Sequence, residues 1–131
     1  MESLDEIYND LIMEHSMNSS NKKELDKCDY CEMGHNPNCG DEIKIQVKLN
    51  GNIIEDMAFT GHGCAISQAA ADLVLDEVIG KNIEEVKHMT KEDVLDLLGL
   101  ETLGPARMKC ALLSLKVLKS AIYGVDEPKN E

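Results

Sequence analysis

A strict alternation of apolar and polar residues marks the middle of the chain. The apolar positions are Ile43, Ile45, Val47 and Leu49, and the positions between them are Lys44, Gln46 and Lys48. A period of two predicts a β-strand with one buried and one wet face. Asn50-Gly51 follows at once and predicts a type I′ hairpin turn into a second strand over residues 53–59. The chain must therefore cover the apolar face of a hairpin with other elements.

Helical periodicity dominates on both sides of the hairpin. Apolar spacing and a capping box of Ser3 and Glu6 predict a helix over residues 4–12. A second helix is expected over residues 66–78, with Gly80 as its C-cap. Two short helices should begin after Asn82 and Thr90, and a last helix should run from residue 105 to residue 124.

These elements indicate an α+β fold, a small antiparallel sheet of about three strands packed against a layer of helices. Residues 30–31 allow a short first strand. The 131 residues suffice for one domain, which we expect to span residues 1–124, with a frayed acidic tail over residues 125–131.

Charge and targeting signals narrow the function. The chain has 13 Lys and Arg against 25 Asp and Glu, a net charge of -12 that repels phosphate backbones and anionic lipid. Neither nucleic acid nor a membrane is an expected partner. The sequence has no signal peptide at its start and no long apolar run, so a cytoplasmic location is expected. Five cysteines in such a chain favour metal or sulfur chemistry over disulfides.

Three of the cysteines stand where predicted elements begin. Cys39 lies in a turn before the first hairpin strand, Cys64 opens the helix over residues 66–78, and Cys110 lies near the start of the last helix. Thiolates brought together at one end of a domain select zinc or iron–sulfur iron. A cysteine can equally be a small buried hydrophobe, and the apolar helix around Cys110 fits that role as well.

Three motifs carry a family resemblance. They are the segments 36–41 (NPNCGD), 53–67 (IIEDMAFTGHGCAIS) and 105–110 (PARMKC). Together they resemble the U-type iron–sulfur cluster assembly proteins, the IscU, SufU and NifU N-terminal group, over about residues 4–123. The resemblance implies an α+β sandwich.

It also implies a site of Cys39, Asp41, Cys64 and Cys110 that holds a zinc ion or a transient cluster, [2Fe–2S] in the first instance. The implied partners are a cysteine desulfurase as sulfur donor and Fe–S acceptor or carrier proteins. Cys110 is the candidate persulfide acceptor. Within the site, the Asp41 carboxylate is a harder and more exchangeable ligand than the thiolates.

The last motif mixes features of two branches of this group. Lys109 stands where the IscU branch usually has a histidine, which resembles the SufU branch, yet the chain from residue 80 to residue 110 is too short for the insertion typical of SufU. The leading interpretation is a cluster scaffold. A zinc-dependent sulfurtransferase that accepts sulfur and activates a desulfurase is an alternative, and a structural zinc module for protein binding is another.

The remaining candidates are accessory. Cys28 and Cys31 form a C-x-x-C pair followed by His35, which allows a second metal, a redox or sulfur-relay pair, or plain thiols. Lys109 joins this accessory group through its place beside Cys110. His15 and His88 are expected to be solvated, and His62 to lie near the site without binding metal.

Overall fold

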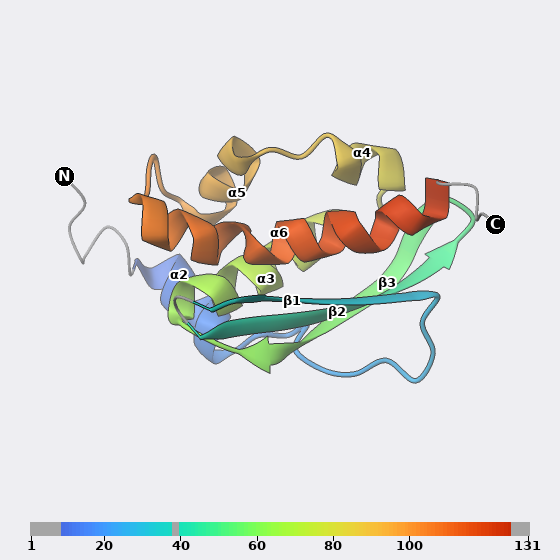
Figure 1. The fold of residues 1–131 in the computed structure, drawn as a ribbon, viewed down its shortest axis with the longest axis horizontal. Helices are drawn as coiled ribbons and strands as arrows, with labels where there is room; N and C mark the ends of the chain where they lie inside the picture. Colours follow the sequence, from blue (N-terminus) through green and yellow to red (C-terminus); the bar gives the residue numbers. More distant parts are fainter. Residues whose placement is uncertain (1–8, 38–39, 127–131) are drawn as a thin grey trace.

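The structure, a computed structural model, describes residues 9–37 and 40–126. Its elements in chain order are α2 (Asp10–Met17), β1 (Tyr30–Asn36), β2 (Asp41–Asn50), β3 (Ile53–His62), α3 (Ala65–Val78), α4 (Ile83–Lys87), α5 (Lys91–Leu98) and α6 (Pro105–Asp126). The long helix α6 runs along the sheet, with α4 and α5 on its far side (Figure 1). The predicted α+β class is confirmed, because a three-stranded antiparallel sheet packs against helices. In the described part of the chain no helix is both long enough and apolar enough to cross a membrane.

The sheet has the order β1-β2-β3, and both neighbouring pairs are antiparallel. The predicted alternation holds on β2, where Ile43, Ile45 and Val47 are fully buried and the residues between them are partly exposed. The short strand expected at residues 30–31 extends to Asn36, because each of its seven residues pairs with β2.

The predicted type I′ turn is wrong. Strands β2 and β3 are joined by Gly51 and Asn52, and among the described residues positive φ is confined to glycines, with Gly51 at 63°. A type I′ turn needs two consecutive residues with positive φ, whereas a type II′ turn needs one, at its first loop position. Next to the turn, the register slips between Lys48 and Leu49, which leaves Glu55 as an extra residue on β3 and makes Gly51 and Asn52 the two loop residues.

The first described helix also begins later than predicted. Residues 1–8, with the expected capping box, lie outside the described residues. Asn9 has an extended backbone and accepts a hydrogen bond from the Ile12 N–H at 2.8 Å, so it caps α2. The expected continuous helix through residue 9 is therefore wrong, and α2 runs on to Met17.

The later helices follow the sequence closely. Asn82 and Thr90 each cap a short helix through a capping box, and Gly99 ends α5 in the left-handed conformation. Ile79, not Gly80, is the C-cap of α3. Helix α6 continues to Asp126, so the first two residues of the expected tail are helical, and residues 127–131 lie outside the described residues.

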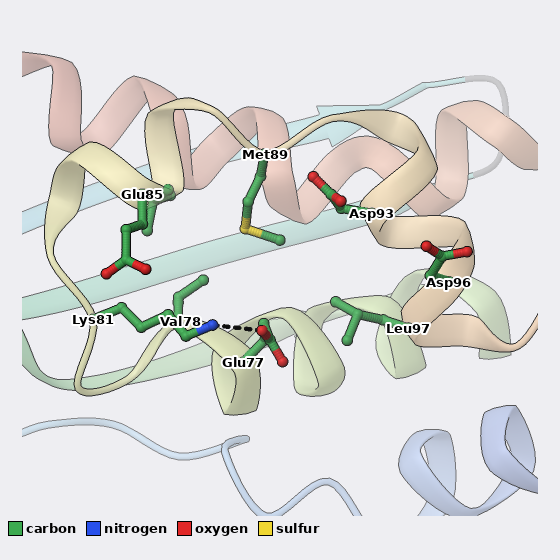
Figure 2. A pocket seen from close by; sticks show the side chains of 9 residues that line it. Glu77, Val78, Lys81, Glu85, Met89, Asp93, Asp96 and Leu97 are labelled. Carbon is green, nitrogen blue, oxygen red and sulfur yellow. Dashed lines mark hydrogen bonds and ion pairs between the residues drawn. The ribbon is translucent and has the colours of Figure 1, made fainter.

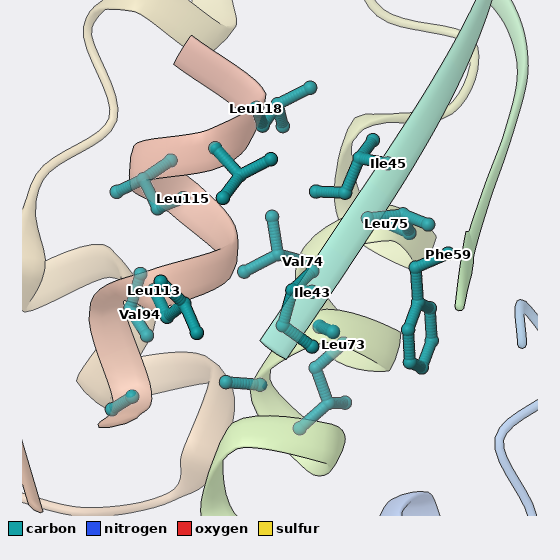
Figure 3. Packing of buried hydrophobic residues seen from close by; sticks show 14 of the residues in the cluster. Ile43, Ile45, Phe59, Leu73, Val74, Leu75, Val94, Leu113, Leu115 and Leu118 are labelled. Carbon is teal, nitrogen blue, oxygen red and sulfur yellow. The ribbon is translucent and has the colours of Figure 1, made fainter. Parts of the chain in front are cut away.

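The core lies between the sheet and the two long helices. Figure 3 shows Leu118 of α6 on the side of the helix toward Ile45 of β2, beside Val74 of α3, whereas Leu115 lies on the side of α6 away from β2. Apart from the fully buried Phe59, this core is mainly aliphatic. Packing of this kind fixes the starts of β2, α3 and α6 relative to one another. The cysteine motifs lie at these starts, so a shared metal site depends on this packing.

Candidate metal centre

Three elements bring one donor group each to the same place. Asp41 is the first residue of β2, Cys64 is the residue before α3, and Cys110 lies in the second turn of α6. One ligand atom from each lies within 4.8 Å of the other two. The predicted gathering of Asp41, Cys64 and Cys110 is thus what the fold produces.

Asp41 connects β2 to the start of α3. Its side chain is buried, with 1% of the residue exposed, and its Oδ1 accepts a hydrogen bond from the Cys64 N–H at 2.9 Å. Its other oxygen, Oδ2, lies 4.0 Å from the Cys64 Sγ. The carboxylate therefore positions the backbone of Cys64 with one oxygen and faces the thiol with the other.

The segment before α3 keeps the Cys64 thiol available. Cys64 occupies the N-cap position, but its side chain makes no capping hydrogen bond. The preceding Gly63 has a φ of 153°, and a Cβ there would lie 2.2 Å from Asp41 Oδ1. Only glycine fits this position, because a side chain would both strain the backbone and displace the carboxylate.

Cys110 is buried, with 3% of the residue exposed, as the packing interpretation expects. Its sulfur nevertheless has a polar neighbour, since the side-chain N–H of Asn36 donates toward Sγ at 3.8 Å. Asn36 is the last residue of β1 and is itself buried. The thiol therefore lies at the polar end of an otherwise apolar helix face.

The donor set fits zinc or iron. Thiolate ligands lie about 2.3 Å from tetrahedral zinc, hence about 3.8 Å from one another, and the donor atoms here lie within 4.8 Å of one another. Two sulfurs and a carboxylate suit a borderline or soft metal ion. Cys39, the other predicted ligand, lies outside the described residues, two positions before Asp41 in the chain.

Comparison with known proteins identifies the family of this chain. The model of the NifU-like N-terminal domain family matches residues 7–130. The chain belongs to this family. Among its relatives, the zinc-dependent sulfurtransferase SufU of Bacillus subtilis is 38% identical, over 92% of this chain and 92% of SufU. The iron–sulfur cluster assembly scaffold protein IscU of Thermotoga maritima is 31% identical, over 93% of this chain and 96% of IscU.

Solved structures of the NifU-like family share the fold. FiSufU from Fervidobacterium islandicum AW-1 superposes with a TM-score of 0.77 at 32% identity, covering 92% of this chain and 99% of that protein. A NifU-like N-terminal protein from Brucella abortus gives a TM-score of 0.81, covering 96% of this chain and 99% of that protein. Its 22% identity supports the fold alone.

The accessory cysteines lie elsewhere. Cys31 is exposed on β1 opposite Gln46, and the Gln46 side-chain N–H donates toward the Cys28 Sγ at 3.7 Å. His35 is four residues further along β1, about 13 Å from Cys31 at the rise of a strand. This separation excludes one metal ion bound by Cys28, Cys31 and His35 together.

A direct relay from this pair to the donor cluster is also too long. Cys31 precedes Asn36 by five residues on β1, about 17 Å along the strand, and an odd separation places their side chains on opposite faces of the sheet. Asn36 faces Cys110, so Cys31 faces away from the donor cluster.

Lys109 and His62 lie near the cluster without belonging to it. Lys109 is exposed and lines a hollow between α6 and the end of β1, together with His35. His62 is exposed at the end of β3 and is not part of the donor group.

The expectation of a solvated His15 is wrong. Its Nδ1 lies 2.6 Å from the Oδ2 of Asp72, a fully buried residue of α3. Asn21 donates its backbone N–H and its side-chain N–H to the same carboxylate, at 3.0 and 2.9 Å. These bonds fasten α2 to α3. The signal in the sequence was Asp72 itself, a charged residue inside an apolar helical stripe.

Proposed function

We propose that this chain is an iron–sulfur cluster assembly scaffold. It receives sulfur from a cysteine desulfurase, builds a cluster on Cys39, Asp41, Cys64 and Cys110, and passes the cluster to apo-proteins. The observation that carries the proposal is the convergence of Asp41, Cys64 and Cys110 within 4.8 Å in a NifU-like domain. The cluster, which we expect to be [2Fe–2S], is cargo that the protein passes on and not a resident cofactor.

Cysteine thiolates suit both parts of this task. A thiolate can attack the outer sulfur of a persulfide on the donor protein; a new S–S bond forms, and the old one breaks with its electron pair on the donor thiol. The same thiolates then bind iron. Attack needs an accessible sulfur, and Cys110 is only 3% exposed whereas Cys64 is half-buried. We therefore propose Cys64 as the persulfide acceptor in place of Cys110, the candidate named from the sequence.

The carboxylate gives the site a ligand that can be exchanged. Asp41 Oδ1 is held by the Cys64 N–H, which leaves Oδ2 facing the thiol. A carboxylate is a harder ligand than a thiolate and binds cluster iron less strongly. We therefore assign Asp41 to release, and the thiolates to retention.

A second function is favoured by a specific observation. The relative that is 38% identical is named a zinc-dependent sulfurtransferase, and the motif of this chain with Lys109 before Cys110 resembles the SufU branch. In this alternative the same four residues hold zinc as a cofactor. A cysteine that leaves the metal would then be free to take the sulfur from the desulfurase.

Two measurements on one anaerobic preparation separate these functions. Loading with ferrous iron and sulfide should give visible charge-transfer absorption in a scaffold, and transfer to an apo-ferredoxin should follow. A protein that stays colourless, contains stoichiometric zinc and carries trapped persulfide after incubation with a desulfurase would be the sulfurtransferase. A protein that accepts no sulfur and unfolds when zinc is chelated would be a structural module, and would contradict both. Cys64→Ser, which lacks one thiol of the donor cluster, is the negative control and should show less cluster loading and less zinc binding than wild type.

A further inference from the structure

Helix α6 carries a concentration of positive charge that the rest of the chain lacks. Four of the 13 cationic residues lie on it, and it has no acidic residue before Asp126, its last position. Lys109, Lys116 and Lys119 are spaced seven and three residues apart, which places them on one side of the helix. The rest of the chain has 9 cationic and 24 acidic residues, a net charge of -15.

A groove runs along this side of α6. Its first hollow, of about 670 Å³, lies between α6 and the end of β1, and its second, of about 510 Å³, lies between α6 and the start of α5. The two hollows share Leu112 and Lys116, so they form one surface, named here the α6 groove. Apolar side chains such as Met108, Leu112 and Leu115 form its floor, and lysines stand along its rim.

The lysines of the α6 groove are not neutralised within the described part of the chain. Lys91 and Lys116 are exposed and take part in none of the ion pairs found there, in which the lysines are Lys48, Lys81 and Lys87. Lys119 donates to the backbone carbonyl of Met89 and meets no carboxylate. Unpaired cations around an apolar floor favour a ligand that brings both acidic and apolar groups.

In the acidic hollow on the other side of α4 and α5, most of the charged groups already have partners within the fold (Figure 2). Three of its four carboxylates already have partners. Glu77 pairs with Lys81 at 2.6 Å and raises the pKa of that lysine, while Glu85 and Asp93 accept N–H groups in capping boxes. Most of the acidic residues there are therefore used within the fold, whereas Lys91 and Lys116 of the α6 groove meet no carboxylate in the described residues.

We propose that the α6 groove docks an acidic segment with apolar side chains on a protein that exchanges sulfur or cluster at the metal centre. This inference rests on the proposed function. Asn36 lines the first hollow and contacts the Cys110 Sγ at 3.8 Å, so a segment bound there lies beside the donor cluster. Nucleic acid and anionic membranes present extended arrays of charge that the net charge of -12 repels, whereas a short segment with few acidic groups meets mainly the lysines beside it, because charges further away than about 10 Å are screened by salt. From Lys109 to Lys119 the groove spans about 15 Å, which matches about three helical turns.

The test uses a fluorescein-labelled 14-residue helical peptide of Glu and Leu, and the same peptide with Gln in place of Glu. Lys91→Glu/Lys116→Glu reverses two rim charges away from the donor cluster. Lys22→Glu/Lys23→Glu makes the same change in net charge at exposed positions outside the groove. Fluorescence anisotropy should show at least a tenfold loss of affinity in the first variant, a change below twofold in the second, and little binding of the Gln peptide.

Three results would overturn the proposal. They are equal losses in both variants, equal binding of the Gln peptide, or preferential binding of single-stranded RNA or phosphatidylserine vesicles over the Glu peptide. A second measurement separates this proposal from the proposed function. Loading with iron and sulfide needs no partner, so it should be the same in wild type and in Lys91→Glu/Lys116→Glu, while desulfurase-driven persulfide formation should fall at least tenfold in that variant. Wild type that binds the peptide but never loads a cluster would contradict the scaffold function alone.

Discussion

The two cysteine regions of this protein differ in whether cysteines that are close in the sequence are also close to the donor cluster in the fold. Cys28 and Cys31 form a compact C-x-x-C motif, yet they lie on a loop and one strand, with Cys31 facing away from the donor cluster. Cys64 and Cys110 are 46 residues apart in the chain and lie together with Asp41. Proximity in the sequence is therefore a poor guide to a metal site. The starts of packed elements are a better guide, because packing fixes where those starts meet.

The largest effect should follow from removing a thiol of the donor cluster. Cys64→Ser or Cys110→Ser should lower zinc affinity by more than about 100-fold, because changes to residues around a ligand already cost 10–100-fold and a hydroxyl is a poor substitute for thiolate. Competition with a chromophoric chelator measures the loss. Cys31→Ser is the matched control. Full affinity in both cluster variants would refute the assignment.

Gly63→Ala tests whether the cluster depends on the backbone before α3. The new Cβ would meet Asp41 Oδ1 at 2.2 Å, so stability should fall by about 1–3 kcal/mol and zinc affinity should fall as well. Gly80→Ala is the control, since Gly80 also has positive φ but nothing lies within 4 Å of its Cβ position. Chemical denaturation and chelator competition report the two effects. Equal zinc affinity in both variants would show that Asp41 is not held by this contact.

Asp41→Asn tests the division between retention and release. The amide oxygen can still accept the Cys64 N–H, so we expect zinc affinity to stay within about tenfold of wild type. Transfer of a loaded cluster to apo-ferredoxin should slow, because the exchangeable carboxylate is gone. Asp41→Ala, which loses the hydrogen bond as well, should load less cluster. Faster transfer from Asp41→Asn would mean that Asp41 holds the cluster.

The smallest effect is expected at the outer pair. Cys28→Ser/Cys31→Ser should keep one metal ion per chain and should still accept sulfur from a desulfurase, because neither thiol belongs to the donor cluster. Metal analysis and persulfide trapping check this. If the double variant lost either property, the two regions would have to act together.

The sequence predicted what depends on local pattern. Alternation located β2, capping boxes located α4 and α5, and the motifs around Cys64 and Cys110 named the donor residues. It missed what depends on distant pairing. The His15 bond to Asp72 joins positions 57 residues apart, and the contact between Asn36 and Cys110 spans 74. The bulge next to the hairpin turn also arises from pairing between strands, which no single segment encodes.

X-ray absorption at the zinc edge tests the comparison of the two cysteine regions most directly, because it counts the sulfur atoms bound to the metal. With Cys39, Cys64 and Cys110 as ligands, wild type and Cys28→Ser/Cys31→Ser should both show three sulfurs at about 2.3 Å and one lighter ligand at about 2.0–2.2 Å. Cys64→Ser should show fewer than three sulfurs in whatever zinc it retains. An unchanged sulfur count in Cys64→Ser, or a lower count in Cys28→Ser/Cys31→Ser, would contradict the assignment of the metal centre.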